Sequence, residues 1–93
     1  MMVGIYTVDL FIYEAHSLKD KRRVIKSILD RCHHKFRVSI SEVGDMDLWQ
    51  KAVLGFAFVA TDRTYVEQVM EKVVIEIEKQ GDVEILHVEK EII

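Results

Sequence analysis

The chain contains no proline, no asparagine, a single cysteine (Cys32) and no run of about 20 apolar residues. One cysteine excludes an internal disulfide framework and fits a reducing compartment. The N-terminus enters an alternating strand pattern without a basic region, so we expect neither a signal peptide nor a membrane-spanning helix. These absences predict a cytoplasmic protein. The scarcity of heat-labile residues beside many Glu and Lys also favours a thermophilic source.

The composition is that of a small globular protein. The 93 residues are 49% hydrophobic and 31% charged, and no linker, low-complexity segment or repeat interrupts them. This length suits one domain with one core. We therefore expect residues 1–93 to form a single domain.

The formal net charge of −3 conceals two segments of opposite sign. Residues 16–37 hold eight basic and two acidic side chains, a formal charge of +6. Residues 62–93 hold four basic and nine acidic ones, a formal charge of −5. This segregation predicts that two parts of the folded surface carry opposite electrostatic fields.

Apolar residues that alternate with polar ones predict the strands. The even positions of the first predicted strand are consistently apolar, which indicates one buried face, whereas the third is apolar on both faces, as is typical of a central strand. In the last strand we expect Leu86 and Val88 to be buried. The four predicted strands cover residues 2–13, about 36–40, 51–60 and about 83–92.

Apolar residues at helical spacing predict two helices. The first covers about residues 18–33 and begins with Ser17 as its cap, with Asp20 completing a capping box. The second begins after a cap within residues 61–64 and ends before Gly81, a natural residue just past a helix end.

The resulting order, β-α-β-β-α-β, is that of an α+β ferredoxin-like sandwich, with two helices on one face of a four-stranded antiparallel sheet. The other face of the sheet then has no cover within the chain. An exposed apolar patch usually marks an interface, so we predict self-association or partner binding there. The alternative is partial cover by the stems of Lys and Glu side chains and by the chain termini. The predicted interface residues on this open face are Ile5, Phe11, Val53, Ala57 and Val59.

Residues 54–59 (LGFAFV) match the centre of the RNP1 motif of RNA-recognition domains. Such domains stack bases on aromatic side chains of the open sheet face. That orientation would here turn Tyr6, Phe56 and Phe58 outward and leave Asp9 unpaired against the helices. We therefore predict that these aromatic residues belong to the core.

The first predicted helix carries the best candidate for nucleic-acid contact. Cations near a helix N-terminus are disfavoured by the helix dipole, unless an anion or a partner offsets them. Phosphate groups would do so, with an affinity independent of sequence. The alternative is a solvated face with exposed ion pairs to the acidic second helix or to Asp30. The candidate nucleic-acid-binding residues are Lys19, Lys21, Arg22, Arg23 and Lys26.

No motif for catalysis or cofactor binding is present. The chain lacks G-x-S-x-G, Walker A, G-x-G-x-x-G and H-E-x-x-H sequences. Cys32, His33 and His34 are adjacent on a helix and point about 100° apart, so they do not converge on one metal. We therefore expect no catalytic residue, no metal, no cofactor and no enzymatic activity.

Two segments, residues 16–24 (HSLKDKRRV) and 47–55 (DLWQKAVLG), together resemble the YlxP-like family of small bacterial proteins of unknown function. The similarity extends over essentially the whole chain. It implies a ferredoxin-like fold and a gene neighbourhood of translation-initiation and ribosome-maturation factors. No catalytic residue is established for the family. Within the second segment, Trp49 is either a partner anchor or packs over the end of the sheet.

These observations lead to two main functional hypotheses, with a hydrolase as a distant third. The first is a non-enzymatic, dimeric accessory protein that binds RNA or a ribosomal particle through the first helix. The second is a homo-oligomeric regulatory or protein-interaction module that uses the open sheet face.

Overall fold

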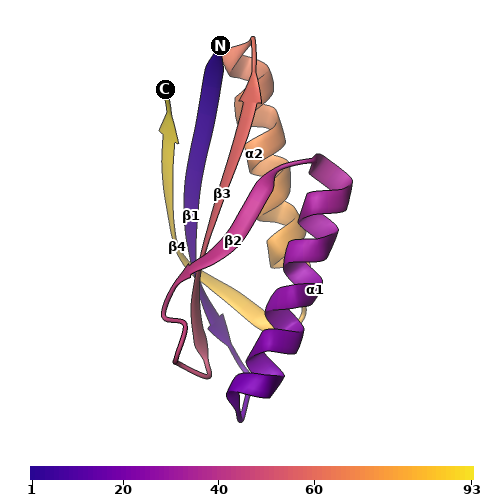
Figure 1. Ribbon diagram of the computed structural model, residues 1–93, viewed down its shortest axis with the longest axis vertical. Helices are drawn as coiled ribbons and strands as arrows, with labels where there is room; N and C mark the ends of the chain where they lie inside the picture. The colour runs from indigo at the N-terminus through magenta and orange to yellow at the C-terminus, as the bar shows by residue number, and fades with distance from the viewer.

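The computed structural model describes all 93 residues and confirms the ferredoxin-like order. The sheet is antiparallel with strand order β2-β3-β1-β4, so β1 and β3 are central. Both helices cover one face of this sheet (Figure 1). Neither helix is long and apolar enough to cross a lipid bilayer. The elements are β1 Met2–Ile12, α1 Leu18–Phe36, β2 Ser39–Gly44, β3 Lys51–Ala60, α2 Arg63–Glu78 and β4 Val83–Ile92.

Helix α1 begins at the predicted cap, Ser17, but Asp20 does not complete a capping box with the N–H of Ser17. The helix ends later than predicted. The hydroxyl of Ser17 accepts a hydrogen bond from the backbone N–H of Asp20 (3.1 Å), and the Asp20 carboxylate accepts one from the N–H of His16 (3.1 Å). The helix stops at Phe36 because Arg37 adopts a left-handed conformation and its N–H bonds back to the carbonyl of His33. Strand β2 therefore starts at Ser39 rather than at residue 36.

Helix α2 starts at a cap within the predicted segment. The carboxylate of Asp62 accepts a hydrogen bond from the N–H of Tyr65 (2.9 Å). The helix ends through Lys79, which keeps a right-handed helical conformation. Gly81 has no positive φ angle, so it does not end the helix with a left-handed turn, and that part of the prediction is wrong.

The core lies between the helices and the even-numbered side chains of β1 and β3. Tyr6 and Phe56 are almost completely buried, with ring centroids 5.6 Å apart. Phe58 is partly buried and packs against the same core. The prediction that the RNP1-like aromatic residues face the helices is confirmed, and the base-stacking orientation is excluded.

Strand β4 contains a bulge that the periodicity did not reveal. Leu10 of β1 pairs with Ile85 and Asp9 pairs with His87, so Leu86 is an extra residue opposite β1. As a result Leu86 is 50% exposed, and its predicted burial is wrong. The strand contributes Val83 to the core instead, while Val88 packs at its border.

Candidate nucleic-acid interface

Four cations form a continuous stripe on the exposed side of α1, which we call the basic stripe. At 100° per residue their side chains fall within an arc of roughly 100°. The opposite side of α1 is buried against the sheet through Ile25, Ile28 and Cys32. The residues of the basic stripe are Lys19, Arg22, Arg23 and Lys26, all exposed.

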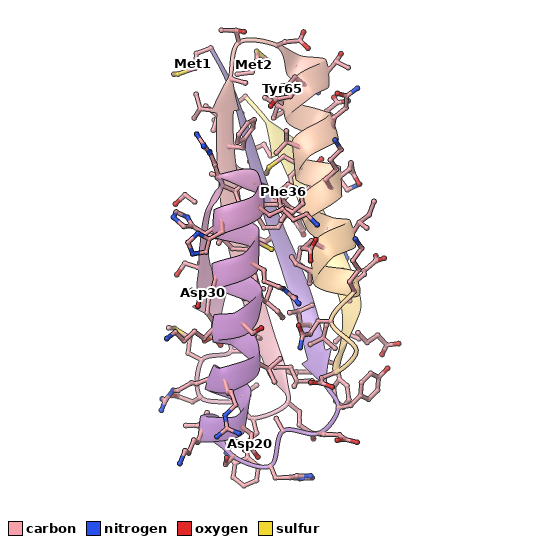
Figure 2. The ribbon with its side chains drawn as sticks, turned by 90° about the vertical axis from the view of Figure 1, so that its right-hand side faces the viewer. Met1, Met2, Asp20, Asp30, Phe36 and Tyr65 are labelled. Carbon is pink, nitrogen blue, oxygen red and sulfur yellow. The ribbon has the colours of Figure 1, made fainter.

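No residue of the basic stripe is neutralised by an acidic side chain. The ion pairs within 4.0 Å involve other cations, and α1 reaches Glu76 of α2 only through Arg31 and Lys35. Asp30 lies within the same arc, and Figure 2 shows it on the side of α1 away from α2. The basic stripe therefore faces solvent, beyond the reach of the acidic residues of α2.

Lys21 does not belong to this surface, and its assignment as a nucleic-acid contact is corrected by its burial. Only 1% of the residue is exposed. Its ammonium group lies 2.7 Å from Oε2 of Glu42 and donates a hydrogen bond to the carbonyl oxygen of Asp45 (2.6 Å). The Glu42 carboxylate thereby offsets the unfavourable position of the Lys21 cation near the positive end of the helix dipole. A phosphate group has no access to Lys21.

The sequence did contain a signal for the burial of Lys21. Lys21 precedes Ile25 by four residues and Ile28 by seven, which is the spacing of the buried side of α1. Glu42 was not singled out as its partner, because a contact 21 residues away depends on how β2 packs beside α1.

The β2–β3 hairpin carries a second exposed feature next to the start of α1. Asp45 has a positive φ angle of 56°, and its carbonyl accepts a hydrogen bond from the N–H of Leu48 (3.1 Å), which closes a tight turn. Met46, Leu48 and Trp49 are all exposed, Trp49 by 54%. Trp49 therefore does not pack fully over the end of the sheet. Figure 1 shows the hairpin at the same end of the molecule as the start of α1.

The open face of the sheet is apolar along most of β3, whereas on β1 its apolar residues Ile5 and Phe11 are separated by Thr7 and Asp9. Val59 and Ile5 are exposed, while Phe11, Val53 and Ala57 are partly buried by their neighbours. A shallow hollow of about 310 Å³ lies at the centre, where Gly55 and Ser41 leave space. All five residues predicted for this face lie on it. The sixth interface candidate, Trp49, lies in the hairpin instead.

Strand β4 gives the open face an acidic border. In the antiparallel register Phe11, Thr7 and Ile5 of β1 lie opposite acidic residues of β4, so these acids share the uncovered face. All three acidic residues of β4 are exposed. The acidic residues are Glu84, Glu89 and Glu91.

Two titratable core residues are held in their neutral forms. Burial raises the pKa of the Cys32 thiol to about 11. Burial, together with the carboxylate of Glu71, raises the pKa of Tyr6 to about 12. The Tyr6 hydroxyl donates a hydrogen bond to Glu71 (3.1 Å), which also accepts one from Lys90 (2.7 Å). A buried neutral thiol is a poor nucleophile, and Cys32, His33 and His34 form no metal-binding cluster.

Comparison with known proteins places the chain in a family. Residues 3–90 match the model of the family described as "Protein of unknown function (DUF503)". The chain belongs to the DUF503 family. A curated relative of this DUF503 chain, the uncharacterised protein YlxP of Bacillus subtilis (strain 168), is 41% identical over 83 residues, covering 89% of the chain and 90% of YlxP. The resemblance to YlxP-like proteins is confirmed.

Solved structures share the fold of this DUF503 chain at low sequence identity. A de novo designed protein with a ferredoxin fold superposes with a TM-score of 0.60 at 9% identity, over 99% of the chain and 84% of the designed one. The designed protein Foldit4 gives 0.56 at 19% identity, over 100% and 97%. The structural-genomics protein YJCS gives 0.57 at 16% identity, over 96% of both chains. These likenesses concern the fold alone.

Proposed function

We propose that this protein is a non-enzymatic accessory protein that binds structured RNA, such as that of a ribosomal particle, through the basic stripe of α1. One observation carries the proposal: four exposed cations share one side of a helix and none of them has an acidic partner. The implied gene neighbourhood of translation and ribosome-maturation factors supports RNA as the source of the phosphates.

The net negative charge of the protein is compatible with this role. At physiological ionic strength electrostatic interactions decay over about 8 Å. The acidic residues of β4 lie on the uncovered face of the sheet, whereas the basic stripe lies on the outer side of a helix that covers the other face (Figure 1). A phosphate beside α1 is attracted mainly by the local cations.

The test is co-sedimentation with ribosomal subunits, together with binding to a ribosomal RNA fragment, across a salt series. If all four cations contact phosphates, affinity should fall by roughly 50- to 150-fold between 50 and 200 mM salt. Charge reversal at Lys19, Arg22 and Lys26 should abolish binding.

A matched control separates local from global charge. Reversal of the exposed Lys51, Lys72 and Lys79 changes the net charge by the same amount and leaves the basic stripe intact. This control should bind nearly as the wild type does. Binding that is absent, insensitive to salt or lost equally in both variants would exclude the proposal.

A second candidate role, self-association, is favoured by the uncovered apolar strip on the open face. Three strands of ten or eleven residues and one of six, about 4.8 Å apart, present roughly 550 Å², below the approximately 800 Å² per partner of a standard interface. A two-fold axis parallel to the strands would place β4 over β2 of the second copy. That orientation sets Glu89 and Glu91 against Ser39 and Ser41, whereas a perpendicular axis would oppose acidic residues with acidic residues.

A further inference from the structure

We propose that the basic stripe and the hairpin turn at residues 45–50 form one surface that selects RNA with unpaired nucleotides. The basic stripe would hold the phosphate backbone, and Trp49 would stack on an unpaired base. This inference rests on the proposed function and adds the class of RNA that the same surface recognises.

The first step of the argument is that the hairpin turn is fastened to α1. The buried ammonium group of Lys21 binds both Glu42 in β2 and the backbone carbonyl of Asp45 in the turn. The Lys21 side chain leaves the helix about 100–160° from those of the basic stripe, so it fastens the turn to the same segment of α1 from its buried side. The turn and the stripe therefore belong to one rigid unit.

The backbone on both sides of Trp49 is also held. The N–H of Leu48 bonds to the carbonyl of Asp45, and the carbonyl of Gln50 accepts a hydrogen bond from Ile12 (2.7 Å). The side-chain amide of Gln50 donates a hydrogen bond to the carbonyl of Tyr13 (3.1 Å). A half-exposed indole is thus presented from a constrained backbone, so binding a flat ligand requires little ordering of the loop.

The charges of the turn favour contact of Trp49 with a base of the RNA and disfavour contact with a phosphate. Asp45 and Asp47 precede Trp49 in the turn, are both exposed and would repel a phosphate there. An indole ring beside these carboxylates is instead suited to the face of a base, and stacking on aromatic side chains tolerates any base. The phosphates of the same RNA would lie along the cations of α1, none of which has a carboxylate within 4.0 Å, although Arg23 shares a hollow with Asp20 and Asp82.

Stacking on Trp49 requires a base outside a double helix. In A-form RNA the bases are stacked on one another, and proteins reach mainly the backbone and the minor groove. The basic stripe alone would bind any RNA, whereas Trp49 adds affinity only for loops, bulges and ends. The combined surface therefore predicts a preference that charge by itself does not produce.

The only tryptophan of the chain is the residue under test, so its intrinsic fluorescence reports binding directly. The probes are a 12-nucleotide single-stranded RNA and a 12-base-pair RNA duplex, titrated into the wild type at fixed salt. We expect the single strand to quench the fluorescence and to bind more tightly. The duplex should bind through α1 without quenching.

Two substitutions of Trp49 sharpen the test. Trp49→Ala should weaken single-strand binding by about 5- to 150-fold and leave duplex affinity and the salt slope unchanged. Trp49→Phe, which keeps an aromatic face, should retain most of the affinity. Since Trp49 is half exposed, both variants should fold, and circular dichroism checks this.

The outcomes separate this inference from the proposed function. If the basic-stripe reversal abolishes binding but Trp49→Ala binds both RNAs as the wild type does, stacking is excluded and RNA binding stands. If neither RNA binds the wild type, both proposals fail. A change in oligomeric mass of Trp49→Ala, without a change in RNA affinity, would identify Trp49 as a contact between copies and overturn the inference.

Discussion

The ammonium group of Lys21 lies 2.7 Å from the carboxylate of Glu42, although Lys21 is 1% exposed and comes from a helix whose other early cations face solvent. The same ammonium group donates a hydrogen bond to the Asp45 carbonyl. The pair therefore joins α1, β2 and the hairpin turn. Breaking it should affect the fold, whereas changing the neighbouring cations should affect only the surface.

Lys21→Ala should lower the free energy of unfolding by about 3 kcal/mol, because it leaves Glu42 without its counter-charge inside the protein. Urea denaturation measures the change. Lys19→Ala, an exposed cation two residues away, should alter stability by no more than about 0.5 kcal/mol. The double variant Lys21→Met with Glu42→Leu should recover much of the loss, since no unpaired charge remains. Equal effects of Lys19→Ala and Lys21→Ala would contradict the structure.

Gly4 and Gly81 should respond in opposite directions to substitution by alanine. A Cβ atom at Gly4 would come within 2.7 Å of Val66 and 3.0 Å of Met70, so Gly4→Ala should destabilise the protein by about 1–3 kcal/mol through overpacking. Gly81 has no atom within 4 Å of such a Cβ and no positive φ angle. Gly81→Ala should therefore raise the free energy of unfolding by about 0.4–1 kcal/mol, because alanine lowers the conformational entropy of the unfolded chain. Thermal unfolding of the two variants tests both signs.

Glu76 should make stability depend on pH in the acid range. Its carboxylate accepts a hydrogen bond from Lys35 (2.8 Å), which holds its pKa below the usual range of a glutamate. Because the pKa of Glu76 is lower in the folded state, its ionised carboxylate stabilises the protein at pH values above the pKa in the unfolded chain, which is about 4.3. This stabilisation is lost as the pH falls through the folded pKa.

Glu76→Gln should flatten the corresponding part of the stability profile, measured by denaturant midpoints between pH 2.5 and 6. Glu78→Gln is the matched control, because Glu78 lies exposed on the same helix and forms no ion pair. It should retain the wild-type profile. A profile that Glu76→Gln does not alter would remove Glu76 as a source of acid sensitivity.

Self-association through the open face should be sensitive to charge at the centre of the apolar strip. The double variant Ile5→Glu with Val59→Glu should be monomeric by light scattering at concentrations where the wild type is dimeric, because the new carboxylates would be buried unpaired. Ile75→Glu, an equally exposed position on α2, should remain dimeric. A monomeric wild type, or dissociation by Ile75→Glu, would rule out this interface.

Local patterns in the sequence were enough to predict the fold and the orientation of its central strands. The period-two pattern of β1 predicted the burial of Tyr6, and the limits of β3 were predicted to the residue, because these features depend on side chains close together in the chain. The caps at Ser17 and within residues 61–64 follow from equally local hydrogen bonds. The exposure of most cations on α1 also followed from helical spacing alone.

The tertiary structure decided the features that depend on distant partners. Leu86 is exposed because the register against β1 inserts a bulge, and no pattern within β4 specifies that register. Lys21 is buried because Glu42 and the Asp45 carbonyl meet it, which requires β2 to pack beside α1. The turn that carries the exposed Trp49 is fastened to α1 by the same contacts of Lys21. Through its periodicity, the sequence by itself determined which side chains belong to each face of each helix and strand. Only tertiary packing decided which faces and turns meet, because contacts between elements join residues whose separation no local pattern encodes.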